Sequence, residues 1–273
     1  MNPVDPRDTP MSPEAVAALP AAGFLGGLLG VTRLALAGIV VVVATVVILA
    51  SSLVPLKIRD TRLSLWATAG TARALLAIFG VRLIVDDPKR LRAHRGFVFF
   101  NHFSWIDPVV LMAATPVRYL AAAGVKKLPF IGWVGRAVGT VFVNRGNDAS
   151  REAARDGLRD AIASSLTPVA LAPEGGIKPG PPVRPFRYGA FEVAAEARQP
   201  VLLVALAYTP WARAAWQDGE TLIDAAWRVS ARRGPFIARV TPLERVMPSA
   251  SGIEADARAA EATLNEALTR AGE

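Results

Sequence analysis

A histidine and an aspartate, His102 and Asp107, stand five positions apart directly after the apolar run FVFF at 97–100. A neutral imidazole can take a proton from a hydroxyl, and a neighbouring carboxylate fixes the imidazole tautomer and stabilises the imidazolium. Transfer of an acyl group from a thioester to an alcohol requires such a base, because a neutral hydroxyl is a poor nucleophile. Positions five apart on an α-helix lie about 140° out of phase. We therefore expect His102 in a turn and Asp107 near the start of the next helix.

Each member of this pair also has an ordinary structural interpretation. Asp107 followed by Pro108 is a common beginning of a helix, and a histidine at a strand end can bond to backbone. Ser104 could be a nucleophile, although a turn hydroxyl that supports the loop is the simpler interpretation. The second histidine, His94, lies in the polar stretch RLRAHRG, so we expect it to be solvated.

Two further groups of residues follow apolar runs. Arg145 comes after TVFV and Asn144, and an arginine there can hold a phosphate or a carboxylate by two parallel hydrogen bonds. Glu174, Gly175 and Gly176 come after PVALA, and the glycines let a ligand approach the backbone closely. Glu174 could orient an acceptor hydroxyl or pair with a basic residue. A surface arginine and a plain turn are the alternatives.

The elements that must position these residues read as alternating strands and helices. Short β-rich runs predict strands at 81–85, 97–100, 117–121, 140–143, 168–172, 201–207 and 236–240. Helical patterns lie at about 148–165, 187–197 and 254–271. Several strands are apolar without alternation, as in strands covered on both faces. The pattern predicts an α/β fold with a mostly parallel or mixed sheet flanked by helices.

The N-terminal third is different in composition. Residues 1–20 are rich in Pro and Asp and read as a disordered tail. Residues 34–54 contain no charged side chain and are long enough to cross a bilayer core of about 30 Å. Residues 63–79 resemble an amphipathic helix that lies on the membrane or on the body, and the two helices could instead form a hairpin in one leaflet. We expect membrane-associated helices over 21–80 and one α/β domain over 81–273.

The charge distribution supports a membrane partner. The net charge is +8, and residues 56–145 hold 14 Lys/Arg against 4 Asp/Glu. A basic zone beside an apolar segment attracts anionic headgroups and favours the cytoplasmic side of a cell membrane for the body. No nucleic-acid motif accompanies the charge, so we expect no nucleic-acid partner. The chain has no cysteine, which excludes disulfides, thiolate metal sites and a cysteine nucleophile.

Taken together, these motifs resemble the lysophosphatidic acid acyltransferase, or glycerolipid acyltransferase, family. Its signature N-H-x-S-x-x-D matches 101–107, its strand-end N-R pair matches 144–145, its P-E-G block matches 173–175, and its proline-led apolar strand matches 200–207. The stretches LPFIGW at 128–133 and PFRYGAF at 185–191 match as well. The resemblance covers about residues 64–210.

The resemblance implies an O-acyltransferase with an α/β body and an N-terminal helical membrane motif. It makes His102 the general base and Asp107 its partner, and it places Asn101 and Ser104 in the substrate-binding motif. It makes Arg145 a contact for the acceptor phosphate and puts Glu174 with its two glycines at the acceptor site. It implies acyl-ACP or acyl-CoA as donor, membrane lipids as partners, and neither metal nor cofactor.

Two departures from the family pattern concern the acceptor. The usual K-K-E-L is replaced by Ala-Ala-Gly-Val at 122–125, and E-G-T-R becomes Glu-Gly-Gly-Ile at 174–177. Lys126, Lys127 and Lys178 lie near these positions and could substitute for the missing groups. We expect a site that is less specific for phosphate than is usual in the family. The acceptor could be 1-acylglycerol-3-phosphate, a lyso-aminolipid or a glycolipid, and a non-catalytic lipid-binding protein is the rival from another class.

Overall fold

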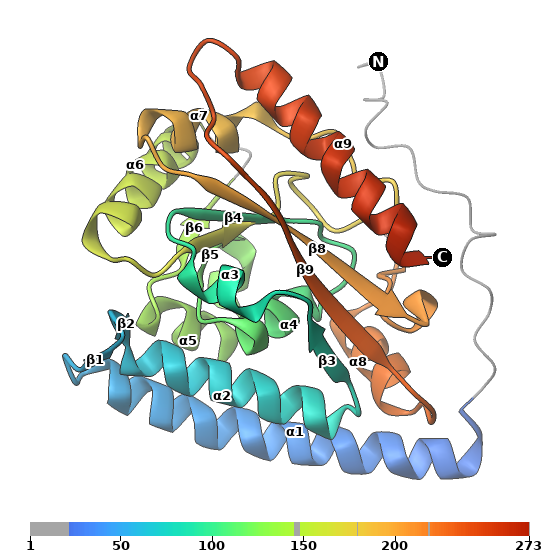
Figure 1. The fold of residues 1–273 in the computed structure, drawn as a ribbon. Helices are drawn as coiled ribbons and strands as arrows, with labels where there is room; N and C mark the ends of the chain where they lie inside the picture. The colour runs from blue at the N-terminus through green and yellow to red at the C-terminus, as the bar shows by residue number, and fades with distance from the viewer. Residues whose placement is uncertain (1–21, 145–147, 179, 218, 273) are drawn as a thin grey trace.

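The computed structural model describes residues 22–144, 148–178, 180–217 and 219–272. Its centre is a seven-stranded sheet with the order β3-β9-β8-β4-β7-β5-β6 (Figure 1). The strands are β3 (Arg82–Val85), β4 (Phe97–Phe100), β5 (Arg118–Ala122), β6 (Val141–Val143), β7 (Val169–Leu171), β8 (Val201–Thr209) and β9 (Ile237–Val246). Each overlaps one of the seven runs that predicted a strand, and β8 and β9 extend beyond theirs.

The sheet is mixed and mostly parallel, as predicted. The pairs β4–β8, β4–β7, β5–β7, β5–β6 and β3–β9 are parallel, and only β8–β9 is antiparallel. β4 therefore lies inside the sheet, hydrogen-bonded on both sides, with its carboxyl end at the same edge as those of β7 and β8. The loops that follow these strands meet at this edge, which is where α/β sheets bind ligands.

Helices cover both faces of the sheet (Figure 1). On one face α2 (Leu63–Ile78) and α4 (Asp107–Ala114) pack against the side of β4 that carries Val98 and Phe100. On the other face α6 (Asp148–Ser164), α7 (Tyr188–Glu196) and α9 (Ile253–Gly272) pack against the side that carries Phe97 and Phe99. Both faces of the continuous apolar run FVFF are thus buried, which explains why it lacks polar alternation.

The helix α1 (Gly23–Ser52) lies along the outer side of α2 and forms a hairpin with it (Figure 1). The hairpin closes through two short strands, β1 (Lys57–Ile58) and β2 (Thr61–Arg62). Ala37 and Ile48 of α1 and Leu65 and Leu76 of α2 belong to the same buried cluster as the sheet. The helix predicted over 63–79 therefore packs on the body. The boundary placed at residue 80 stays a prediction, since the core continues across it.

Close packing ties the first half of α1 to α8 (Leu222–Ser230). A Cβ on Gly26 would come 2.6 Å from the Ala231 carbonyl oxygen, so only glycine permits this approach. Arg33 donates from Nη1 to the carbonyl oxygens of Ser230 and Arg232, 3.1 and 3.0 Å away, at the C-terminal end of α8. A cation there interacts favourably with the helix dipole.

The outward face of α1 is apolar. Among the described residues α1 is the one helix long and apolar enough to cross a membrane by length and composition. Its large exposed side chains are Phe24, Leu25, Leu28, Val31, Leu36, Ile39, Val42, Val43, Val46, Val47 and Leu49. An exposed apolar surface of this extent marks an interaction site. By its length and composition, this face is suited to contact with a membrane.

The sequence patterns did not predict the shortest elements, nor α8. These are α3 (Pro88–Ala93), the 3₁₀ turns at Ala123–Lys127 and Trp211–Arg213, α5 (Ile131–Ala137), and the β1–β2 hairpin. Each has at most nine residues, and at that length periodicity alone is a weak signal; strands of similar length were recognised by their continuous apolar runs instead. The expectation that His94 is solvated is wrong. His94 follows α3, is 7% exposed, and its Nε2 lies 2.8 Å from the Phe97 carbonyl oxygen.

Candidate active site

The loop that carries His102 is anchored where β4 ends. Asn101 is fully buried and its side-chain amide bonds twice to Leu206 of β8. Nδ2 donates to the Leu206 carbonyl oxygen at 2.9 Å, and Oδ1 accepts from the Leu206 N–H at 2.8 Å. The side chain thus continues the β4–β8 ladder by one step. Asn101 fixes the start of the loop, and its polar atoms are used within the protein.

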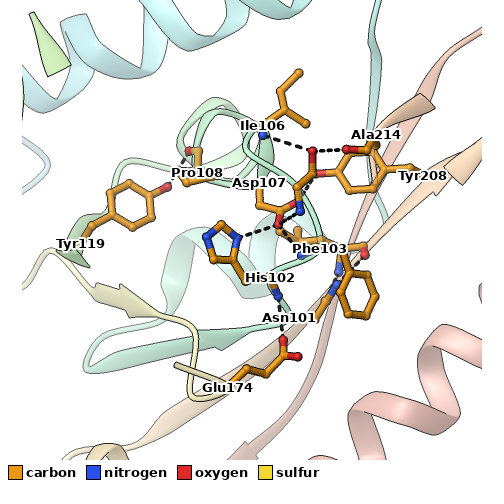
Figure 2. A network of polar contacts seen from close by, with 12 residues as sticks. Asn101, His102, Phe103, Ile106, Asp107, Pro108, Tyr119, Glu174, Tyr208 and Ala214 are labelled. Atoms are coloured by element: carbon orange, nitrogen blue, oxygen red, sulfur yellow. Dashed lines mark hydrogen bonds and ion pairs between the residues drawn. The ribbon is translucent and has the colours of Figure 1, made fainter. Parts of the chain in front are cut away.

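His102 and Asp107 form a hydrogen-bonded pair (Figure 2). His102 Nδ1 lies 2.8 Å from Asp107 Oδ2, and the side chains are 21% and 0% exposed. Asp107 is the first residue of α4, so the chain turns between the two residues as predicted. With Nδ1 held by a carboxylate, the neutral ring carries its proton on Nδ1 and offers the Nε2 lone pair. No described residue hydrogen-bonds to Nε2.

The Asp107 carboxylate is held by three further donors. The N–H groups of Phe103 and Ser104 both donate to Oδ2 at 2.8 Å. The hydroxyl of Tyr208 donates to Oδ1 at 2.5 Å. Burial and the charge of Asp107 raise the pKa of Tyr208 well above its ordinary value, so this hydroxyl stays a donor. A fully buried carboxylate needs such partners, and together with His102 they hold both of its oxygens.

The hydroxyl of Ser104 is directed into the protein. The residue is fully buried, and Oγ donates to the Ala214 carbonyl oxygen at 2.5 Å. The same oxygen accepts from the Ile106 N–H at 3.3 Å. This geometry favours the supporting role for Ser104. A direct contact of Ser104 or Asn101 with substrate stays an untested prediction.

Glu174, at the end of β7, lies directly beside the histidine (Figure 2). It is 2% exposed, and Oε1 accepts from the His102 N–H at 2.8 Å while Oε2 accepts from the Arg184 N–H at 2.8 Å. Lys178 N–H donates to the His102 carbonyl oxygen at 2.9 Å, which closes a second link between the two loops. Burial raises the pKa of Glu174 to about 7, against its two amide donors. Glu174 therefore braces the loop that carries His102.

Two arginines that spacing did not indicate flank the turn after Glu174. Gly175 has φ 82°, and a Cβ there would overlap the guanidinium of Arg187. A Cβ on Gly176 would lie 3.6 Å from Arg184 Nη1. Only glycine accommodates both the left-handed backbone and the arginine that crosses it. Arg184 Nε is buried without a hydrogen-bond partner, so this side chain has donor capacity to spare.

Two further residues predicted near the acceptor, Lys178 and Arg145, are not shown in a position to contact it. The Nζ of Lys178 donates to the Pro182 carbonyl oxygen at 2.6 Å, and burial lowers the pKa of this amine. Arg145 lies outside the described residues, so its contact with an acceptor phosphate stays a prediction. The neighbouring Asn144 N–H donates to Ser150 Oγ at 2.9 Å at the start of the next helix.

Comparisons with known proteins indicate the same kind of protein as the motifs at this site. A family model described as Acyltransferase matches residues 82–208. The 1-acyl-sn-glycerol-3-phosphate acyltransferase of Neisseria meningitidis serogroup B is 30% identical over 136 residues, which cover 50% of this chain and 53% of that protein. The lyso-ornithine lipid O-acyltransferase of Rhodobacter capsulatus is 34% identical over 125 residues, which cover 45% and 44%. The chain spans about half the length of these relatives.

The fold has a solved counterpart. The crystal structure of the 1-acyl-sn-glycerophosphate (LPA) acyltransferase PlsC from Thermotoga maritima superposes with a TM-score of 0.68. The match covers 92% of this chain and 97% of that one at 18% identity, and it shows a common fold. The fold is an α/β sheet, and at a strand end a histidine is held by a buried aspartate. Both residues lie within residues 82–208, the stretch of this chain that matches the acyltransferase family model.

Proposed function

We propose that this protein transfers a fatty acyl group from a thioester carrier to the hydroxyl of a lysolipid, with His102 as general base. The observation that carries the proposal is the state of the imidazole. Its Nδ1 is held by the buried Asp107, while Nε2 has no partner among the described residues and the ring is partly exposed. A base so oriented is ready to accept a proton from an incoming hydroxyl.

The reaction follows from this geometry. Nε2 of His102 takes the proton of the lysolipid hydroxyl as its oxygen attacks the thioester carbonyl carbon. Asp107 stabilises the imidazolium that forms. The tetrahedral intermediate collapses, the carbon–sulfur bond breaks, and the imidazolium returns the proton to the leaving thiolate. The products are a diacyl lipid and a free thiol, and no acyl-enzyme is needed because the acceptor is the nucleophile.

For the acceptor we propose a lysolipid with an anionic headgroup, first 1-acylglycerol-3-phosphate, which would give phosphatidic acid. Arg145 is the family's phosphate contact, and Arg184 and Arg187 bring two guanidinium groups to the Glu174–Gly176 turn. They occupy the neighbourhood in which the sequence lacks the usual threonine and arginine. A lyso-ornithine lipid is the second candidate, since one relative carries that name and its headgroup carboxylate suits the same arginines.

For the donor we propose acyl-ACP or acyl-CoA, and for the location the cytoplasmic face of the cell membrane. Buried residues occur along α1 from Gly26 to Ile48, so α1 cannot cross a bilayer without leaving the body. In-plane insertion of its apolar face into one leaflet retains these contacts. Protease added outside intact cells should leave the body of residues 81–273 uncut, and digestion there would show the opposite orientation.

The decisive experiment incubates the purified protein in detergent with a panel of donors and acceptors. The donors are acyl-ACP and acyl-CoA, and the acceptors include lysophosphatidic acid, lyso-ornithine lipid and a neutral lysolipid. Products are identified by mass spectrometry. Formation of a diacyl product that depends on His102 supports the proposal. Lipid binding without any product from any pair would identify a non-catalytic relative instead.

A further inference from the structure

A basic cavity lies at the end of the sheet opposite to His102. Its volume is about 340 Å³, and it opens between the β1–β2 hairpin, α3 and the loops that lead into β5 and β7. Arg95, in its wall, precedes β4, and His102 follows β4. At about 3.3 Å per residue the strand separates the cavity from the catalytic histidine by roughly 20 Å. The cavity is therefore no part of the acyl-transfer site.

Four cations line the cavity and no carboxylate does. They are Arg59 from the hairpin, Lys89 and Arg92 from α3, and Arg95. Arg59, Lys89 and Arg92 are exposed and form no ion pair with any described residue. Arg95 Nη1 donates to two backbone carbonyl oxygens at 3.0 and 2.9 Å, which orients its guanidinium. Like charges gathered without counterions repel one another, so an anion bound among them would be stabilised.

Two buried groups near the cavity have pKa values that are lowered first by burial and further by neighbouring positive charges. Burial lowers the pKa of His94 to about 4, and the charges of Arg245, Arg95 and Arg90 contribute in the same direction. Burial and the charge of Arg62 lower the pKa of Arg118 to about 10. The Nη2 of Arg118 donates at 2.6 Å to the carbonyl oxygen of Thr167, a residue of the cavity wall.

Arg59, one of these cations, stands in the β1–β2 turn with an unfavourable backbone conformation. Arg59 and Asp60 form a two-residue loop with φ values of 50° and 63°. Such loops favour Asn-Gly, and an arginine in the left-handed region is disfavoured. The turn carries an arginine there nonetheless, and its side chain lines the cavity. Strain of this kind gathers at ligand sites.

Apolar residues stand beside the cavity mouth. Leu53, Val54, Leu56 and Ile58 are exposed by 85%, 48%, 50% and 45%, and they lead from the apolar face of α1 into Arg59. Trp66, in the cavity wall, donates from Nε1 to the Ile58 carbonyl oxygen at 3.0 Å. A ligand that suits both surfaces has an anionic head and an apolar tail.

We propose that this cavity binds the phosphate-bearing headgroup of an anionic phospholipid of the host membrane, which is neither donor nor acceptor in the reaction. Arg59 and Arg92 hold the phosphate oxygens, with Lys89 as a point charge, and the acyl chains lie along Leu53–Ile58. The volume suits a small headgroup, and guanidinium groups suit phosphate geometry. The inference does not depend on the proposed transfer reaction, because it concerns binding alone.

The test compares two charge-matched double variants of the whole chain. Arg59→Gln/Arg92→Gln removes two cavity charges, and Arg82→Gln/Arg198→Gln removes two exposed charges elsewhere, one of them also at a positive φ. Thermal unfolding is followed with increasing dihexanoyl phosphatidylglycerol, dihexanoyl phosphatidylcholine or inorganic phosphate. A ligand of the native state raises the midpoint with its concentration, without any turnover. Sedimentation with phosphatidylcholine vesicles, with and without phosphatidylglycerol, measures binding at a bilayer.

We expect phosphatidylglycerol to raise the midpoint of the wild type and of the control, and to bind the cavity variant at least about tenfold more weakly. Binding to vesicles that contain phosphatidylglycerol should fall likewise, and binding to pure phosphatidylcholine should not change. Equal responses of the cavity and control variants would overturn the proposal. An equal effect of phosphatidylcholine would show that the site does not select a lipid with net negative charge, and an equal effect of phosphate alone would make the ligand a free anion. Either result would overturn it as well.

Discussion

The two loops that meet at His102 use their polar groups differently. In the catalytic loop the side chains of Asn101, Ser104 and Asp107 are fully buried, and every bond they make is internal. In the loop after β7, Glu174 is equally committed to backbone amides, but Arg184 keeps a buried Nε without a partner. The first loop is organised around the His102–Asp107 pair, as the proposed proton transfer requires. The second retains uncommitted cations, and such groups can adapt to a headgroup.

The difference indicates which substitutions should affect chemistry and which should affect choice of acceptor. A residue that orients the base acts on the rate of the chemical step whatever the acceptor. A cation beside the glycine turn acts on the acceptors that carry an anion. Variants of the two loops should therefore separate in kcat and KM.

The largest effect is expected for His102→Ala. Loss of the general base should lower kcat by about 10²–10⁴-fold while the protein stays folded and membrane-bound, because the ring makes a single side-chain hydrogen bond. Product formation is measured by mass spectrometry, and thermal unfolding checks the fold. Turnover within about tenfold of the wild type would refute the role of His102 as base.

The next largest effect is expected for Asp107→Asn. An amide at this position can donate to Nδ1 and would leave the proton on Nε2, which is the wrong tautomer for a base. The amide would also face the N–H donors of Phe103 and Ser104. We expect a loss of about 10²–10³-fold in kcat for every acceptor, measured across the panel. A loss confined to phosphate-bearing acceptors would contradict the comparison of the loops.

Arg184→Gln should change the choice of acceptor. A charge-assisted hydrogen bond contributes about 1.5–3 kcal/mol, so KM for lysophosphatidic acid should rise by roughly tenfold to a hundredfold. The kcat and the KM for a neutral lysolipid should change little. Arg198→Gln, an exposed arginine on another loop, is the matched control. Equal slowing of all acceptors would make Arg184 structural.

Much of this architecture could be predicted from the sequence, because its signals lie within short stretches of the chain. The seven strands were recognised because apolar runs such as FVFF are buried on both faces, and His102 with Asp107 was recognised because both lie in one short motif. Arg184 could not be placed by spacing, because a proline-rich loop brings its amide back to Glu174, ten residues earlier. Tyr208 reaches Asp107 across 101 positions, and no local pattern signals that contact.

Tyr208→Phe tests that long-range contact. The substitution removes one donor from a buried carboxylate, which costs about 1–3 kcal/mol and loosens the orientation of His102. We expect kcat to fall by about tenfold with KM unchanged, since the buried hydroxyl touches no substrate. Tyr119→Phe is the matched control, because its hydroxyl donates to the Pro108 carbonyl oxygen at 2.6 Å rather than to Asp107. Equal effects of the two variants would assign Tyr208 to packing.

The last prediction concerns stability rather than turnover, through Glu174 and pH. Burial raises its pKa to about 7 from the ordinary value of 4.5, so the folded protein holds this proton more tightly than the unfolded chain does. Stability should therefore fall as the pH rises from about 4.5 to about 7, by at most about 3 kcal/mol through this group, and should change no further above that range. Glu174→Gln should remove this slope of the unfolding midpoint against pH. The exposed Glu266→Gln should keep it. Parallel curves for the wild type and Glu174→Gln would show that this carboxyl is not the group that titrates.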